Sequence, residues 1–283
     1  MRTIIVIVIA TVAMFTACRR APVSQTEVAS VAVSKLSLDP ANSVWNDAPE
    51  HTAKLLLQDL VEPRLMKAST QDVRVRAVHS GPEIAFRLSW TDATLNDEPG
   101  PGRFLDGCGI QIPRKIEPNP PEPQMGQAGR AVEITFWRAD WQASVNGRKD
   151  TIQALFPNAT VDHYPFEAKS LEPGSAAQKE MATRFAPAAA VGNRRVGPRE
   201  FPVEDMVAEG PGTLSPVKDG ASRGKGVRTK DGWAVVMSRK LPEGLAAGTR
   251  TQIAFAVWEG SAQEAGSRKM RTGWIPLALR EGK

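Results

Sequence analysis

Apolar and polar residues alternate with a period of two over much of the chain, a pattern typical of β-strands that bury one face. The pattern is clearest in residues 73–78 and 83–90, which a Ser-Gly-Pro turn at 80–82 joins into a predicted hairpin. Further strands are predicted at 109–112, 131–137, 233–237, 252–258 and 274–279. About seven strands with turn-rich connections predict an all-β fold, an antiparallel β-sandwich with long insertions and one or two short helices.

Two segments between these strands are unusually rich in turn residues. Residues 91–130 contain thirteen Gly or Pro, and the run from Pro118 to Pro123 cannot continue a central strand. The second segment, an insertion at about 142–232, has one predicted helix, from Ser175 to Phe185. Its glycine-rich part at 220–226 and the basic residues around it predict a solvated turn, which could dock an acidic partner surface. Long irregular segments inside a compact domain are usually functional.

The first residues have the pattern of an export signal. Arg2 precedes an apolar run at 3–17, which is too short to span about 30 Å of hydrocarbon comfortably and fits a signal peptide. Thr16 and Ala17 before Cys18 resemble a bacterial lipoprotein cleavage site, with Cys18 as the lipidated residue; an ordinary signal peptide is the alternative. We therefore expect a signal peptide at 1–17, a tether at 18–44 and one domain at 45–283, exported to the periplasm or the outer face of the membrane.

Composition and charge exclude several classes of protein. The chain has 36 Lys or Arg and 31 Asp or Glu, a formal charge of +5, and this mild basic excess is no evidence for nucleic-acid binding. Two cysteines cannot by themselves hold an iron-sulfur cluster or a cysteine-based zinc site. If Cys18 is acylated, Cys108 is left alone, and a lone cysteine in a strand is predicted to pack in the core.

Motifs for catalysis are scarce. The histidines lack metal-ligand spacing, and the chain contains no HExxH, nucleophile-elbow, Walker or CxxCH motif. Six of the seven tryptophans are expected to pack in the core or against sheet faces: Trp90, Trp137, Trp141, Trp233, Trp258 and Trp274. Nothing in these patterns predicts that the chain is itself a catalytic enzyme.

Five stretches, taken in their order and spacing, carry a resemblance to a known family. They are residues 86–90, 104–113, the Met125-Gly126 step, 137–142 and 257–269. Together they resemble the haem-binding gamma subunits of type II molybdenum enzymes of the dimethyl sulfoxide reductase superfamily, the ethylbenzene dehydrogenase-like haem-binding domain. The resemblance covers roughly Trp45 to Leu279.

The resemblance implies one non-covalent b-type haem inside the β-sandwich, with Met125 and Lys269 as the axial ligands of the iron. The family's lysine motif usually reads Gly-Lys-Ser, whereas this chain has Arg268-Lys269-Met270, so Met270 or a one-residue shift stays open. His79 and His163 are an alternative pair of ligands. With both axial positions filled by protein, such a site would pass electrons and bind no substrate. Arg or Lys near the mouth of the site could pair with the haem propionates.

As the resemblance implies, the partners would be an iron-sulfur beta subunit and a molybdopterin alpha subunit of an oxidoreductase of nitrate, nitrite, chlorate or hydrocarbon type. Electrons would pass between the iron-sulfur subunit and a soluble cytochrome or the quinone pool. Two other hypotheses remain: a non-redox exported β-sandwich that binds carbohydrate or protein through its tryptophans, and an assembly lipoprotein for the same complex.

Overall fold

The computed structural model describes residues 26–149, 154, 156–158, 172, 174–185 and 199–281. Its helices and strands, in chain order, are β1 (Val28–Ala32), the 3-10 helix η1 (Ser43–Asn46), β2 (His51–Lys54), β3 (Leu56–Leu57), β4 (Asp72–Ser80), β5 (Glu83–Thr91), β6 (Gly107–Pro113), β7 (Val132–Arg138), α1 (Ala139–Val145), α3 (Ala176–Phe185), β8 (Val203–Ala208), β9 (Ser215–Pro216), β10 (Arg223–Arg228), β11 (Gly232–Lys240), β12 (Arg250–Trp258), the 3-10 helix η2 (Gly260–Ala262), β13 (Met270–Arg271) and β14 (Ile275–Leu279).

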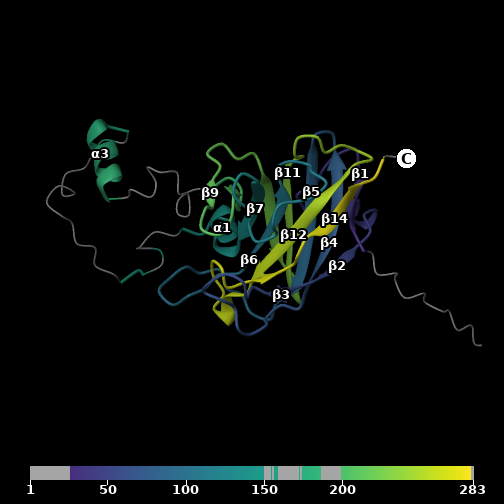
Figure 1. Cartoon of the computed structure of the whole chain (residues 1–283). Helices are drawn as coiled ribbons and strands as arrows, with labels where there is room; N and C mark the ends of the chain where they lie inside the picture. Colours follow the sequence, from purple (N-terminus) through teal and green to yellow (C-terminus); the bar gives the residue numbers. More distant parts are fainter. Residues whose placement is uncertain are drawn as a thin grey trace, which may run out of the picture.

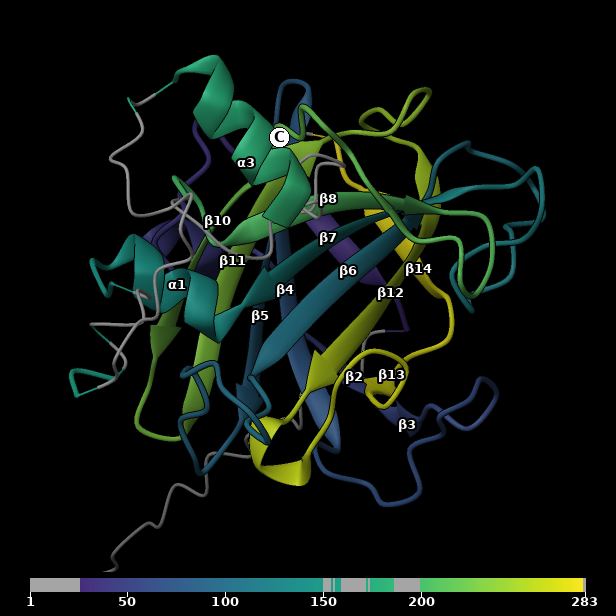
Figure 2. The ribbon, with the colours of Figure 1, turned by 90° about the vertical axis from the view of Figure 1, so that its left-hand side faces the viewer.

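The strands form two layers that share β12. The first layer has the order β10-β11-β5-β4-β1-β14-β12, and the second has the order β12-β6-β7-β8-β9 (Figure 1). Residues 250–253 of β12 pair with β14, and residues 254–258 pair with β6. Figure 2 shows β12, β6, β7 and β8 lying in front of β4, β5 and β11. The predicted all-β sandwich is confirmed, with one difference: β1 runs parallel to both of its neighbours, β4 and β14.

The core lies between the two layers and follows the predicted alternation. Phe86 and Leu88 of β5 face inward from the first layer, and Ile110 of β6 and Phe255 of β12 face inward from the second. Cys108 is fully buried in this core, as predicted for a lone cysteine. Burial of these side chains supplies the main stabilising free energy of such a fold, at about 25 cal/mol per Å² of apolar surface.

The N-terminal segment belongs to the fold rather than standing apart from it. β1 lies within the segment predicted as a tether, and the first three of its five residues are buried. Trp45, in η1, is buried with Ala48 and Val236 on the outer face of the first layer, where residues 31–44 also contribute apolar side chains. The alternation did not reveal β1, because the strand is short, made of small residues and covered on both faces.

The glycine-rich basic segment predicted as a turn is instead strand β10, paired with β11 along its whole length. Gly226 explains why the segment lacks ordinary strand residues. A Cβ at this position would lie 2.4 Å from the Trp137 ring, so the indole occupies the space that a side chain would need. The prediction of a turn was therefore wrong.

The strands and the helix that the sequence predicted are present, and the structure also has elements that were not predicted. Strands lie at all seven predicted positions, and α3 lies at the predicted helix. Helix α1 was not expected, because its sequence directly continues an alternating strand. Within the described part of the chain, no helix is both long enough and apolar enough to cross a membrane. The predicted signal peptide, Cys18 and His163 lie outside the described residues.

Replacing Gly226 with alanine should lower the free energy of unfolding by about 1–3 kcal/mol, because the new methyl group would displace the Trp137 indole from a packed core. Urea unfolding of the purified protein measures this change. Gly273→Ala is the matched control, since a Cβ there has no neighbour within 4 Å. Equal stability of the two variants would contradict the packing role of Gly226.

Candidate functional site

A cavity of about 470 Å³ lies on the outer face of the second layer, away from the core. Its floor is made of outward-facing positions on β6 and β12 that carry almost no side chain. Gly109 of β6 pairs with Ala256 of β12, and Ala254 lies two residues before Ala256. A Cβ at Gly109 would lie 3.6 Å from the Trp258 ring and 3.7 Å from the Phe136 ring. Small residues at these positions leave a hollow in an otherwise covered sheet.

The walls of the cavity are mainly apolar. Phe136 and Ile134 of β7 rise on one side, and Trp258 stands at the end of β12. The rings of Phe136 and Trp258 contact each other edge to face, with 5.0 Å between their centroids. Met206 and Leu214 also line the cavity. A concave, largely apolar site of this volume falls within the range of about 300–1,000 Å³ that small molecules and cofactors occupy.

The Pro-rich segment brings Met125 into this cavity. Proline carbonyls anchor the segment, because the Gln111 side chain donates to the Pro123 carbonyl at 3.0 Å and the Trp274 indole donates to the Pro121 carbonyl at 2.6 Å. The Met125 carbonyl accepts a hydrogen bond from the backbone N–H of Gly210 at 2.8 Å. Both side-chain donors come from the sheet or its connections, so the fold fixes the loop over the cavity.

Met125 has an unusual backbone conformation, with φ of 67°. A side chain in the left-handed region is uncommon, and backbone strain of this kind tends to gather at functional sites. The next residue, Gly126, has φ of 83°, and a Cβ there would lie 2.9 Å from the Arg130 carbonyl oxygen and 3.0 Å from that of Ala208. The Met-Gly step therefore requires its glycine, and the strained turn directs the methionine.

Lys269 reaches the same cavity from the turn before β13. The Lys269 carbonyl accepts from the backbone N–H of Gln58 at 3.1 Å, and the Trp258 indole donates to the Gly266 carbonyl at 3.0 Å. The half-buried Lys269 side chain places its Nζ atom 5.1 Å from the Trp258 ring centroid. Burial, and secondarily the charge of Arg271, lowers the pKa of this ammonium to about 8.

The structure thus brings Met125 and Lys269 into one cavity, and it places two of the alternative ligands, Met270 and His79, elsewhere. Met270 points the other way and packs in the core with 2 % of its surface exposed. His79 is buried in the first layer, where its Nδ1 atom hydrogen-bonds the Ser30 hydroxyl at 2.9 Å. Neither residue lines the cavity. The sequence reasoning did not identify the three arginines that line it, Arg103, Arg138 and Arg271.

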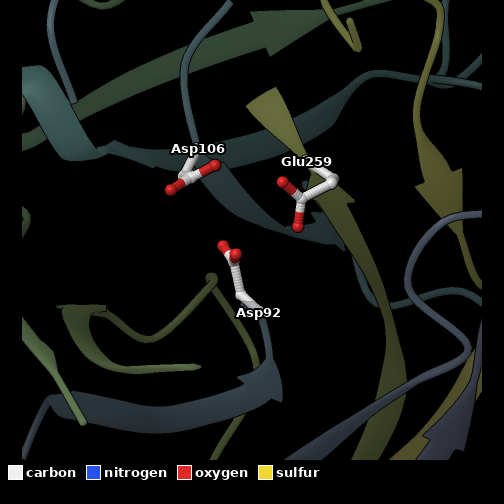
Figure 3. A group of neighbouring side chains, drawn as sticks. All are labelled: Asp92, Asp106 and Glu259. Atoms are coloured by element: carbon white, nitrogen blue, oxygen red, sulfur yellow. The ribbon is translucent and has the colours of Figure 1, made fainter. Parts of the chain in front are cut away.

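A second group of chemically notable side chains lies at the end of the core. Asp92 follows β5, Asp106 precedes β6 and Glu259 follows β12, and their carboxyl groups point toward one another (Figure 3). One oxygen from each lies within 4.8 Å of the others, a spacing that a divalent cation could also bridge. Protein donors already surround the group: Trp233 and the Gly260 N–H donate to Asp106, and Arg228 lies 3.5 Å from Asp92.

The three buried carboxyl groups hold protons more tightly than exposed ones do. Desolvation is the largest cause that raises the pKa of Asp92, Asp106 and Glu259 above the ordinary carboxyl values. The negative charge of a neighbouring carboxylate raises the pKa of each group further. Asp92 and Glu259 interact directly through their side chains, so one proton can be shared between them. This cluster ties together the ends of three strands from both layers and does not line the cavity.

Comparison with known proteins places the chain in a family. The family model of ethylbenzene dehydrogenase matches residues 42–270, which is most of the chain. The chain belongs to the ethylbenzene dehydrogenase family. The match includes β6, β7 and β12, which form the floor and one wall of the cavity, as well as Met125 and Lys269. The predicted family is confirmed.

Two relatives of this ethylbenzene dehydrogenase family member carry names that describe a function. A protein of Haloferax mediterranei, described as a respiratory nitrate reductase heme subunit, is 23 % identical over 268 residues, which are 92 % of this chain and 75 % of that protein. The chlorate reductase subunit gamma of Ideonella dechloratans is 26 % identical over 235 residues, 80 % of this chain and 72 % of that protein.

Among solved structures, a family 9 carbohydrate-binding module of Caldicellulosiruptor kristjanssonii in complex with cellotriose aligns with 90 % of this chain and 94 % of its own. Its TM-score is 0.41 and its sequence identity is 9 %.

The cluster of Asp92, Asp106 and Glu259 should make the stability of the protein depend on pH. Because the folded-state pKa values are raised, the native protein binds these protons more tightly than the unfolded chain, and stability should fall as the pH rises above the ordinary carboxyl range near 4. Glu259→Gln removes one charge and keeps the oxygen that accepts from Ser261. It should flatten the fall in unfolding free energy that begins above the ordinary carboxyl range, because one of the groups with a raised pKa is removed.

Chemical denaturation at a series of pH values measures this slope. Glu243→Gln makes the same change on an exposed side chain and should follow the wild-type slope. A Glu259→Gln slope that also matches the wild type would contradict the raised carboxyl pKa values.

Proposed function

We propose that the chain holds one non-covalent b-type haem with Met125 and Lys269 as axial ligands, and that it is the electron-transfer subunit of a molybdenum oxidoreductase. The observation that carries this proposal is that the two side chains, 144 positions apart in the sequence, line the same apolar cavity. The relatives support it, since one is described as a nitrate reductase heme subunit and the other as a chlorate reductase subunit gamma.

The cavity suits a flat, largely apolar ring with a polar edge. Its floor is nearly bare at Gly109, Ala254 and Ala256, so a planar ligand can approach the sheet closely. Its walls are apolar and aromatic, and arginine side chains supply positive charge within the lining. The donor set of one thioether and one amine is neutral once the lysine is deprotonated, and both are known kinds of ligand for iron in a haem.

The state of Lys269 favours ligation by its amine. A lysine must lose its proton to bind a metal, and an ordinary lysine with a pKa near 10.4 has less than about 0.1 % free amine at neutral pH. The pKa of about 8 raises that fraction to about a tenth at pH 7. Desolvation within the protein therefore removes part of the free-energy cost of presenting the amine to iron.

The chemistry that a haem supplies here is one-electron transfer at its iron. Met125 and Lys269, which both line the cavity, would hold the iron, so no ligand position would be left for a substrate. Phe136 and Trp258 would cover the group and exclude water from it. A soft, neutral thioether stabilises the reduced iron and raises the reduction potential. The carboxyl cluster lies outside the cavity.

The proposed partners are an iron-sulfur beta subunit and a molybdopterin alpha subunit, with a soluble cytochrome or the quinone pool as the second redox partner. The two relatives are described as subunits of a nitrate and a chlorate reductase, so we propose a complex of either type beside the hydrocarbon type for which the family is named. We further propose that the chain is exported and anchored to the membrane by lipid at Cys18, so that the haem domain works on the periplasmic side.

Reconstitution with haem tests the proposed function and the axial ligands. The purified protein should bind one haem and show a low-spin spectrum with a sharp α-band on reduction. Met125→Ala or Lys269→Ala should each abolish the low-spin spectrum or convert it to high spin, because one axial position loses its ligand. Absorption spectra of the oxidised and reduced forms provide the measurement.

Met66→Ala and Lys67→Ala are the matched controls, since both side chains are exposed and neither lines the cavity. They should leave the spectrum unchanged. Wild-type protein that takes up no haem would refute the proposed function, whereas a normal spectrum in both ligand variants would refute only the axial assignment.

A further inference from the structure

Three arginines line the cavity, and they differ in whether a carboxylate already neutralises them. Arg103 pairs with Glu98, and the Arg103 side chain is 58 % exposed. Arg138 makes a bidentate pair with Asp140 and also stacks on the Trp141 ring, with 4.6 Å between the guanidinium carbon and the ring centroid. These two cations are satisfied by the protein itself.

Arg271 is buried without an equivalent partner. It lies on β13, opposite Ala256 of the cavity floor, and its side chain is only 13 % exposed. Its buried Nε–H has no hydrogen-bond partner among the described residues, and one terminal nitrogen reaches the Thr272 carbonyl only at 3.5 Å. The nearest carboxylate, Asp59, is 4.0 Å away and has a side chain that is 62 % exposed.

The two carboxylates that line the cavity, Glu62 and Glu264, already pair with or accept hydrogen bonds from groups other than Arg271. Glu62 pairs with Arg64 at 2.8 Å. Glu264 accepts hydrogen bonds from the Ser69 hydroxyl and from the backbone N–H of Glu259. A buried guanidinium with an unpaired N–H is costly, because it loses hydration without gaining hydrogen bonds. The cavity therefore has a position for an anion that its ligand must bring.

We propose that Arg271 binds a propionate carboxylate at the edge of the porphyrin ring. This inference rests on the proposed haem and specifies how the cavity orients it. A guanidinium matches a carboxylate through two parallel N–H···O hydrogen bonds, and such charge-assisted pairs are stronger than neutral hydrogen bonds. Because Arg271 extends from the strand next to the floor, the pair would fix which edge of the ring faces β13.

Binding of ferric haem and of its dimethyl ester tests this role. The ester has the same ring and iron but no carboxylates. Arg271→Gln should weaken haem binding by about 10- to 100-fold, and should change affinity for the dimethyl ester by less than about threefold. Arg271→Lys should fall between, because an ammonium keeps the charge and loses the bidentate geometry. Absorbance titration of the full-length protein gives the dissociation constants.

Two controls separate this role from folding and from axial ligation. Arg250→Gln removes the same charge from a side chain that is 70 % exposed and outside the cavity, and should bind both ligands as the wild type does. Metal-free protoporphyrin keeps its propionates, so the Arg271→Gln defect should persist with it, whereas Lys269→Ala should then have little effect.

Each result has one interpretation. An Arg271→Gln variant that binds haem normally, or that loses haem and its dimethyl ester to the same extent, would overturn the role of Arg271. Failure of the wild type to bind any of these porphyrins would instead refute the proposed function.

Discussion

The cavity exists because the outer face of the second sheet has almost no side chains at its centre. A sheet face at the surface normally carries alternating side chains, but Gly109, Ala254 and Ala256 leave the backbone of β6 and β12 nearly bare. The aromatic rings of Phe136 and Trp258 then stand as walls around a hollow instead of closing over it. The proposed roles of Met125, Lys269 and Arg271 all depend on the cavity that these missing side chains leave.

The loops around the hollow are held by the sheet that they cover. Side chains on or next to the strands donate to proline carbonyls of the segment before Met125, and the Trp258 indole holds the turn before Lys269. The Met125 carbonyl accepts a hydrogen bond from the Gly210 N–H, and Gly126 is packed against neighbouring backbone carbonyls, so contacts on both residues hold the left-handed Met-Gly step in place. The fold thus stabilises a strained turn at the place where a side chain has to be directed inward.

The layered fold could be predicted from the sequence because each long strand buries one face against the core. The predictions failed where this rule fails. β1 is made of small residues buried on both faces, and β10 has glycines where Trp137 needs space, so neither shows ordinary alternation. Both errors arise because contacts between residues far apart in the chain determine these strands, and the local pattern of apolar and polar residues does not reveal such contacts.

The candidate site was predictable only in part. Met125 and Lys269 were identified through a family resemblance, since a lone methionine and a lone lysine carry no distinguishing pattern. The structure adds that they line one cavity, and that Met270 and His79 do not. Arg271 could not be singled out from the sequence, because it differs from Arg103 and Arg138 in being largely buried with only a distant, exposed carboxylate, Asp59 at 4.0 Å.

The proposed function requires that the Met125 thioether and the Lys269 amine bind one iron. X-ray absorption at the iron edge of the haem-loaded protein tests it most directly, because the fine structure separates axial sulfur from axial nitrogen. We predict one axial sulfur in the wild-type protein and none after Met125→Leu. A wild-type spectrum with nitrogen in both axial positions, or a sulfur contribution that survives Met125→Leu, would contradict the account.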